Sequence, residues 1–87
     1  MWYQKAIIRN WKKLIESMDT EKVSDHMISK TMLPLDTWER WEMERDARER
    51  RKYLLRYVLN REEAVFHIFL EGLVAAHQTQ LVDLLKP

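Results

Sequence analysis

Residues Tyr53–Leu85 read YLLRYVLNREEAVFHIFLEGLVAAHQTQLVDLL, and their apolar positions fall at helical spacing in three successive segments. The first stripe runs from Leu54 to Leu59, the second from Val65 to Leu73 and the third from Leu81 to Leu85, with short polar breaks between them. A helix with one apolar face must bury that face against another element. Three short amphipathic helices in tandem therefore predict a helical bundle.

Composition extends this prediction to the whole chain. The 87 residues include one glycine, two prolines and no cysteine, and 46% of them are hydrophobic. Low glycine and proline with many Leu, Glu, Arg and Lys favour an all-α fold, and the length suits one domain over residues 1–87. No run approaches the ~20 apolar residues of a membrane span, and no signal-peptide block is present. The lack of cysteine excludes a disulfide scaffold and thiolate chemistry, and it is compatible with a reducing cytosol.

Two helices are predicted before the first proline. Residues 2–18 form one helix, with inward-facing apolar residues Ile7, Ile8, Trp11, Leu14, Ile15 and Met18. Asp19 or Thr20 can cap a second helix that runs to about Lys30. Pro34 then stops it, because proline disfavours helix in the residue before it.

The middle of the chain is predicted to hold a short helix and a longer one. Asp36 can cap the short helix, whose apolar residues are Trp38, Trp41 and Met43. Nothing between Thr37 and Asn60 is a strong helix breaker, so one long helix is an alternative to two. We expect a junction near Arg45–Ala47, where the apolar stripe fades.

The remaining helices complete an antiparallel six-helix bundle. The fourth helix is expected to end near Leu59, and Asn60 to cap the fifth. The fifth helix ends near Ala76, and Thr79 caps or opens the sixth.

Charges are segregated although the net charge is only +1. Basic residues gather in residues 5–13 and 48–56, and the acids lie mainly between them at Glu21, Asp25, Asp36, Glu39, Glu42 and Glu44. Balanced total charge with separated signs suits a protein partner with complementary patches better than a nucleic acid.

The pattern of apolar residues resembles the caspase recruitment domain, a six-helix member of the death-fold superfamily with a Greek-key-like bundle. The resemblance rests on Leu54-Leu55, the polar turn 60–63, Phe66–Leu73 and Leu81–Leu85, which follow the family's spacing without a gap. Residues 22–30 resemble the family's second helix. Within them, Asp-His-Met-Ile-Ser is most similar to the domain of an apoptosome adaptor.

The chain departs from the family at three turns that often hold glycine. These positions are Thr31, Glu62 and His77 here. A left-handed backbone is unfavourable for residues with a Cβ, and especially for threonine. We therefore expect locally different turns within the same fold.

The resemblance implies a non-catalytic domain that binds another caspase recruitment domain, in an initiator caspase or an adaptor, in cytoplasmic apoptotic or innate-immune signalling. Basic residues of the first and fourth helices would meet acidic residues of the second and third. The basic set is Lys13, Arg48, Lys52, Arg56 and Arg9, and the acidic set is Asp25, Glu21, Glu39 and Glu42. One domain with both sets can also self-assemble head to tail. The alternative interpretation of either set is a solvated helix face.

No cofactor, metal site or catalytic group is predicted. His26, His67 and His77 lack metal-ligand spacing, and no nucleophile constellation is present. Trp38 and Trp41 are interpreted as core residues clustering with Met43 or Leu35, with an exposed interface tryptophan as the alternative. Two rival functions stay open: nucleic-acid binding by the Arg48–Arg56 face, and a plain helical oligomerisation module.

Overall fold

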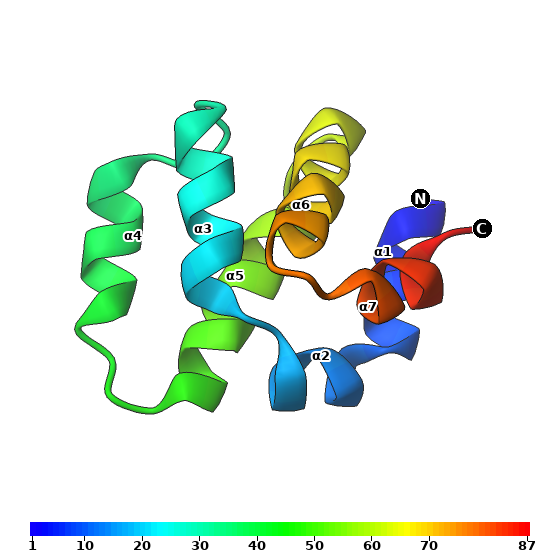
Figure 1. The fold of residues 1–87 in the computed structure, drawn as a ribbon, viewed down its shortest axis with the longest axis horizontal. Helices are drawn as coiled ribbons and strands as arrows, with labels where there is room; N and C mark the ends of the chain where they lie inside the picture. The colour runs from blue at the N-terminus through cyan, green and yellow to red at the C-terminus, as the bar shows by residue number, and fades with distance from the viewer.

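The computed structural model describes residues 1–87 and contains helices and no strands (Figure 1). The helices are α1 (Trp2–Arg9), α2 (Trp11–Ser17), α3 (Thr20–Ser29), α4 (Leu35–Glu42), α5 (Ala47–Leu59), α6 (Glu63–Ala75) and α7 (Thr79–Leu85). The all-α prediction is therefore confirmed. No helix combines the length and the hydrophobicity that crossing a membrane would need.

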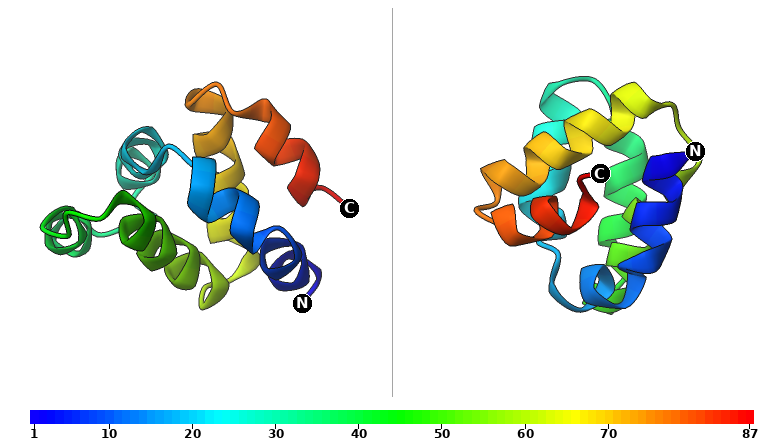
Figure 2. Two further views of the ribbon diagram at one scale, coloured as in Figure 1. Left: turned by 90° about the horizontal axis from the view of Figure 1, so that it is seen from below. Right: turned by 90° about the vertical axis from the view of Figure 1, so that its right-hand side faces the viewer.

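Helix α6 lies in the middle of the bundle. It makes its most extensive contact with α3 and also contacts α5 and α7. Helix α4 lies at the outer edge against α5, while α1 and α2 lie beside α5 on the other side (Figures 1 and 2). Both chain termini lie at the end of the molecule where α1 contacts α7.

The three predicted apolar stripes of Tyr53–Leu85 form much of one core of 21 buried residues. Leu54, Leu55 and Val58 are buried from α5, and α6 packs on both α5 and α7. Tyr3 of α1 joins this core and stacks on Phe66 with ring centroids 5.0 Å apart.

The first predicted helix, residues 2–18, is divided in two at Asn10. The Asn10 backbone lies at φ −105°, ψ 17°. The Asn10 side-chain amide donates to the carbonyls of Ala6 (2.9 Å) and Leu84 (3.2 Å). An asparagine side chain competes with the helix for backbone groups, which explains the break. The break lets α1 contact α7 while α2 packs on α5. Ile8, predicted to face inward, is 61% exposed.

Helix boundaries differ from the prediction at two caps. Helix α4 begins at Leu35 after Pro34, so Asp36 lies in its first turn and does not cap it. Asn60, expected to cap the next helix, lies instead at the C-terminal cap of α5. Glu62 takes the N-cap position of α6. Residues 35–59 form two helices, as expected from the fading stripe.

The junction between those two helices is fixed by a cap that the sequence reading missed. Helix α4 ends at Glu42 and α5 begins at Ala47, and the Asp46 side chain accepts a hydrogen bond from the Arg48 backbone N–H at 2.9 Å. An aspartate at this position satisfies a helix N–H that would otherwise lack a partner. Asp46 therefore sets where the basic helix α5 begins.

The expectation of altered turns is wrong at two of its three positions. Thr31 and His77 have φ values of 58° and 60°, whereas Glu62 is at −70°. After α3, the N–H of Thr31 bonds to the Ile28 carbonyl and that of Met32 to the Met27 carbonyl. After α6, the N–H of His77 bonds in the same way to the Val74 carbonyl, and that of Gln78 to the Leu73 carbonyl. These are Schellman caps, in which the gain from satisfying carbonyls outweighs the strain of a left-handed non-glycine residue.

A close contact between α3 and α6 is made at Gly72, the only glycine of the chain. A Cβ built on Gly72 of α6 would lie 3.0 Å from Val23 Cγ1 and 3.1 Å from the Val23 carbonyl oxygen of α3. Both are tighter than ordinary van der Waals contact, and one of them involves backbone. The lack of a side chain at Gly72 therefore sets the α3–α6 distance.

We predict that Gly72→Ala lowers the free energy of unfolding by about 1–2 kcal/mol in urea denaturation, because overpacking against backbone outweighs the helix preference of alanine. Ala75→Gly, at an exposed position of the same helix, is the control that removes a methyl group without a steric effect. Equal or greater stability of Gly72→Ala would show that α3 moves away freely.

Replacing either left-handed residue with glycine should stabilise the fold. Thr31→Gly and His77→Gly each relieve an αL conformation, and we expect a gain of about 0.5–1 kcal/mol after the entropy of glycine is deducted. Ser29→Gly, in the last turn of α3, should destabilise instead. Thermal melts followed by circular dichroism measure all three, and a loss of stability at Thr31 would contradict the strain argument.

Candidate functional site

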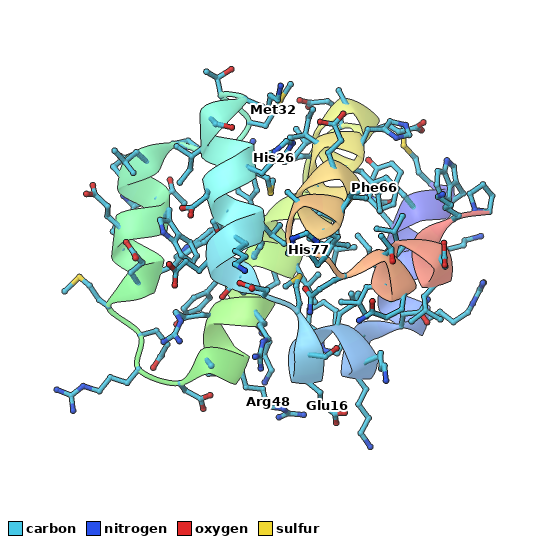
Figure 3. The ribbon with its side chains drawn as sticks, viewed as in Figure 1. Glu16, His26, Met32, Arg48, Phe66 and His77 are labelled. Atoms are coloured by element: carbon cyan, nitrogen blue, oxygen red, sulfur yellow. The ribbon has the colours of Figure 1, made fainter.

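Two of the predicted basic residues lie on helices that pack against each other. Lys13 is exposed on α2 and Arg48 is exposed on α5, and these helices are in direct contact. Neither side chain makes an ion pair within the chain. Lys52 follows Arg48 by one turn, but its Nζ lies 2.8 Å from Glu49 Oε2. Figure 3 shows Arg48 and Glu16 toward the same edge of the molecule in this view.

The other two predicted basic residues lie apart from this pair. Arg9 is exposed on the last turn of α1. Arg56 is exposed two turns after Arg48, where it borders a hollow lined by Trp41 and Tyr57. The five cations therefore extend over three helices and do not form one compact patch.

The basic run of residues 48–56 is divided by the geometry of α5. Arg51 turns toward α2 and donates its Nε to the Met18 carbonyl (2.7 Å) and its Nη1 to the Ile15 carbonyl (3.1 Å). Arg50 donates to the Glu44 carbonyl. Because two arginines of the run bind backbone carbonyls, the run does not present one continuous cationic face of the kind that a phosphate chain follows.

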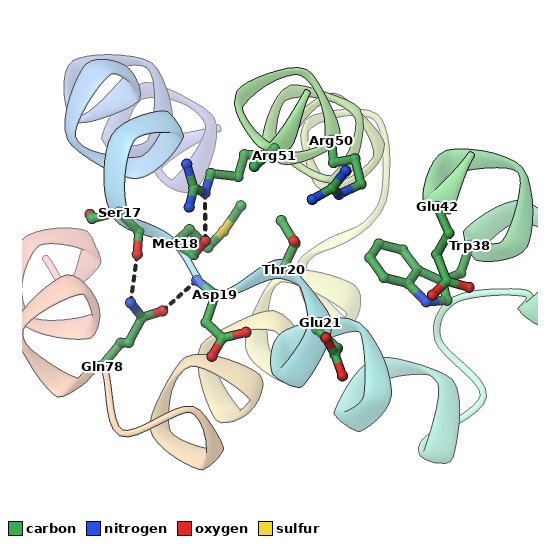
Figure 4. A pocket seen from close by; sticks show the side chains of 11 residues that line it. Ser17, Met18, Asp19, Thr20, Glu21, Trp38, Glu42, Arg50, Arg51 and Gln78 are labelled. Atoms are coloured by element: carbon green, nitrogen blue, oxygen red, sulfur yellow. Dashed lines mark hydrogen bonds between the residues drawn. The ribbon is translucent and has the colours of Figure 1, made fainter. Parts of the chain in front are cut away.

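The predicted acidic residues lie on α3 and α4, and all four are exposed. Glu21 and Glu42 line one cleft of about 640 Å³ between α3, α4 and α5 (Figure 4). Asp25 follows one turn after Glu21, and Glu39 lies on α4 ahead of Glu42. None of the four carboxylates makes an ion pair within the chain, so all four remain available to an external cation.

The cleft also contains two cations, which do not belong to the predicted basic set. Arg50 and Arg51 form its α5 wall, facing Glu21 and Glu42 (Figure 4). No salt bridge joins the two sets, and Arg51 is already bound to carbonyls. The cleft is therefore of mixed charge.

The connection between α2 and α3 is held from two sides. The Gln78 side chain donates its Nε2 to the Ser17 carbonyl (2.7 Å) and accepts the Asp19 N–H at its Oε1 (2.8 Å). Arg51 binds the neighbouring Met18 carbonyl from the opposite side (Figure 4). These contacts fix the basic helix α2 relative to the acidic helix α3. Sequence reasoning missed them because the partners lie more than 30 positions apart.

The tryptophans of α4 occupy different environments. Trp38 is 5% exposed and belongs to the core, as interpreted. Trp41 is partly buried and meets Trp38 edge to face at 6.3 Å. The expected cluster with Met43 or Leu35 is wrong, since these are 82% and 56% exposed.

The histidines lie in separate places. His26 Nε2 is 3.0 Å from Glu71 Oε1 and joins α3 to α6, whereas His67 pairs with Glu63 one turn earlier on α6. His77 is the left-handed residue after α6 (Figure 3). No group of three His, Cys, Asp or Glu side chains is placed to hold a metal ion.

Comparison with known proteins gives one assignment. The family model described as the caspase recruitment domain matches residues 4–87, almost the whole chain. No curated protein matches the sequence.

We predict that Arg51→Met lowers the free energy of unfolding by about 1–3 kcal/mol, because methionine keeps the apolar stem and leaves two carbonyls without their donor. Arg48→Met should change it by less than about 0.5 kcal/mol, since Arg48 is exposed. Urea denaturation measures both. Equal effects at the two positions would refute a bracing role for Arg51.

Proposed function

This chain belongs to the caspase recruitment domain family, and from this we propose that it recruits another member of the family through two oppositely charged faces. Domains of this family are protein-interaction modules that bind one another, with roles in apoptosis and signalling. The proposed partner is the domain of an initiator caspase or of an adaptor, in the cytoplasm.

The basic face is defined by Lys13, Arg48 and Lys52, with Arg9 and Arg56 at its margins. The acidic face is defined by Asp25, Glu21, Glu39 and Glu42. The observation that carries the proposal is the placement of the first set on α2 and α5 and of the second on α3 and α4. The carboxylates of the acidic face make no ion pair within the chain, and neither do Lys13 and Arg48 of the basic face. Such unpaired charges suit a partner with the complementary arrangement.

Arg48 is the favoured anchor of the basic face. It is exposed and has no carboxylate partner, whereas Lys52 already pairs with Glu49. A guanidinium can also bind both oxygens of a carboxylate, which an ammonium cannot do in a fixed geometry. An exposed pair contributes only about 0–1 kcal/mol, so recognition requires several pairs at once.

Two complementary faces on one chain also allow self-assembly. The basic face of one copy would meet the acidic face of the next, which is a head-to-tail contact. Such a contact leaves one free face at each end of the assembly. Growth then depends on concentration and decreases with added salt.

The proposal predicts that Arg48→Glu and Asp25→Lys each abolish assembly, because each variant loses one face. Arg48→Glu lies in the first turn of α5, where a carboxylate favours the helix, so folding is preserved. An equimolar mixture of the two variants should regain a complex, because the acidic face of Arg48→Glu and the basic face of Asp25→Lys are both intact. Sedimentation velocity measures the species.

Arg45→Glu, in the exposed loop before α5, is the matched control and should assemble as the wild type does. Circular dichroism melts of all variants test the fold. The same variants are then tested for binding to initiator-caspase and adaptor domains of the family. Normal binding by both charge reversals would show that the contact lies elsewhere.

A further inference from the structure

A second surface lies on the α4–α5 side of the molecule. The aromatic hollow is defined by Trp41, Tyr53, Arg56, Tyr57, Asn60 and Arg61, and it encloses about 290 Å³. The Trp41 ring lies 6.2 Å from that of Tyr53 and meets the Tyr57 ring nearly edge to face at 5.8 Å. Three partly buried rings of the types most common in binding hot spots therefore line one shallow depression.

The two tyrosine rings are held in place by their hydroxyl groups. Tyr57 donates its hydroxyl to the Met32 carbonyl at 3.0 Å, which ties α5 to the end of α3. The Tyr53 hydroxyl lies 3.4 Å from Glu44 Oε1. A ring fixed at its hydroxyl loses little conformational entropy when a ligand covers its face. The hollow is thus preorganised.

The rim of the hollow is cationic. Arg56 and Arg61 are exposed, and neither makes an ion pair. The Arg61 guanidinium carbon lies 4.5 Å from the Tyr57 ring centre, so this cation is stacked over the aromatic wall. No carboxylate lines the hollow.

These features define the chemistry of the ligand. Aromatic walls of this size accept one apolar or planar side chain, and two arginines exclude a cationic one by repulsion. The same arginines can bind carboxylates on either side of the apolar group. We propose that the aromatic hollow binds an acidic peptide segment of a partner, with an apolar side chain on the rings and flanking carboxylates on Arg56 and Arg61.

The surroundings favour an acidic peptide over single-stranded nucleic acid, which also uses rings and arginines. Glu44 contacts the Tyr53 hydroxyl, so a phosphate chain that extended past Tyr53 would meet this carboxylate. A short segment with one carboxylate on each arginine need not extend that far. The inference goes beyond the proposed function, because the hollow shares only Arg56 with the margin of the basic face and its ligand need not be a second folded domain.

Peptide titration into the intact chain tests the proposal. The readout is the indole N–H resonances of the four tryptophans in two-dimensional NMR, with Trp41 assigned from Trp41→Phe. The probes are nonapeptides of glycine and serine with a central Glu-Phe-Glu, Lys-Phe-Lys or Glu-Ala-Glu, and a hexauridine RNA. We expect the Glu-Phe-Glu peptide to shift Trp41, to leave Trp2 and Trp11 unmoved, and to bind at least about tenfold tighter than the other probes.

Arg56→Glu and Arg61→Glu should each lower the affinity for the Glu-Phe-Glu peptide by about tenfold or more. This is the loss expected for one charge-assisted contact. Both residues are exposed, so folding is preserved, and Arg45→Glu is the control of the same charge change outside the hollow. Trp41→Ala tests the ring, with a melt to check the fold. Tighter binding of RNA, equal binding of all peptides, or no shift at Trp41 would overturn the proposal.

Discussion

The fold depends on the close approach of α3 and α6 at Gly72. Without a side chain there, α6 lies against the backbone of Val23, and the contact between α3 and α6 is the most extensive of the bundle. Helix α6 then serves as the centre on which α5 and α7 pack. A bundle of this size has one modest core, so a change in the α3–α6 distance would also alter the packing of α5 and α7 on α6.

The second determinant is the short connection between α2 and α3. Arg51 and Gln78 bind successive backbone groups of this segment from opposite sides. Their contacts hold the helix that carries Lys13 at a fixed position relative to the helix that carries Asp25. The geometry of both proposed faces therefore depends on residues that belong to neither face.

Helix α5 serves three purposes at once. One side is apolar and buried at Leu54 and Val58, one turns Arg51 toward α2, and one carries the tyrosines toward α4. Successive residues of a helix are about 100° apart, so 13 residues can supply three separate surfaces. A basic run in sequence is thereby distributed over different neighbours.

The sequence by itself determined the all-α class, most helix boundaries and the resemblance to the family, because helical periodicity and helix breakers are local signals. It also determined which charged residues would be exposed, such as Arg48 and Asp25. Only the tertiary structure decided the break at Asn10, the left-handed turns, the sequestration of Arg51 and the aromatic hollow around Trp41. Each depends on partners distant in the sequence, such as the Leu84 carbonyl for Asn10, and a local pattern carries no information about such partners.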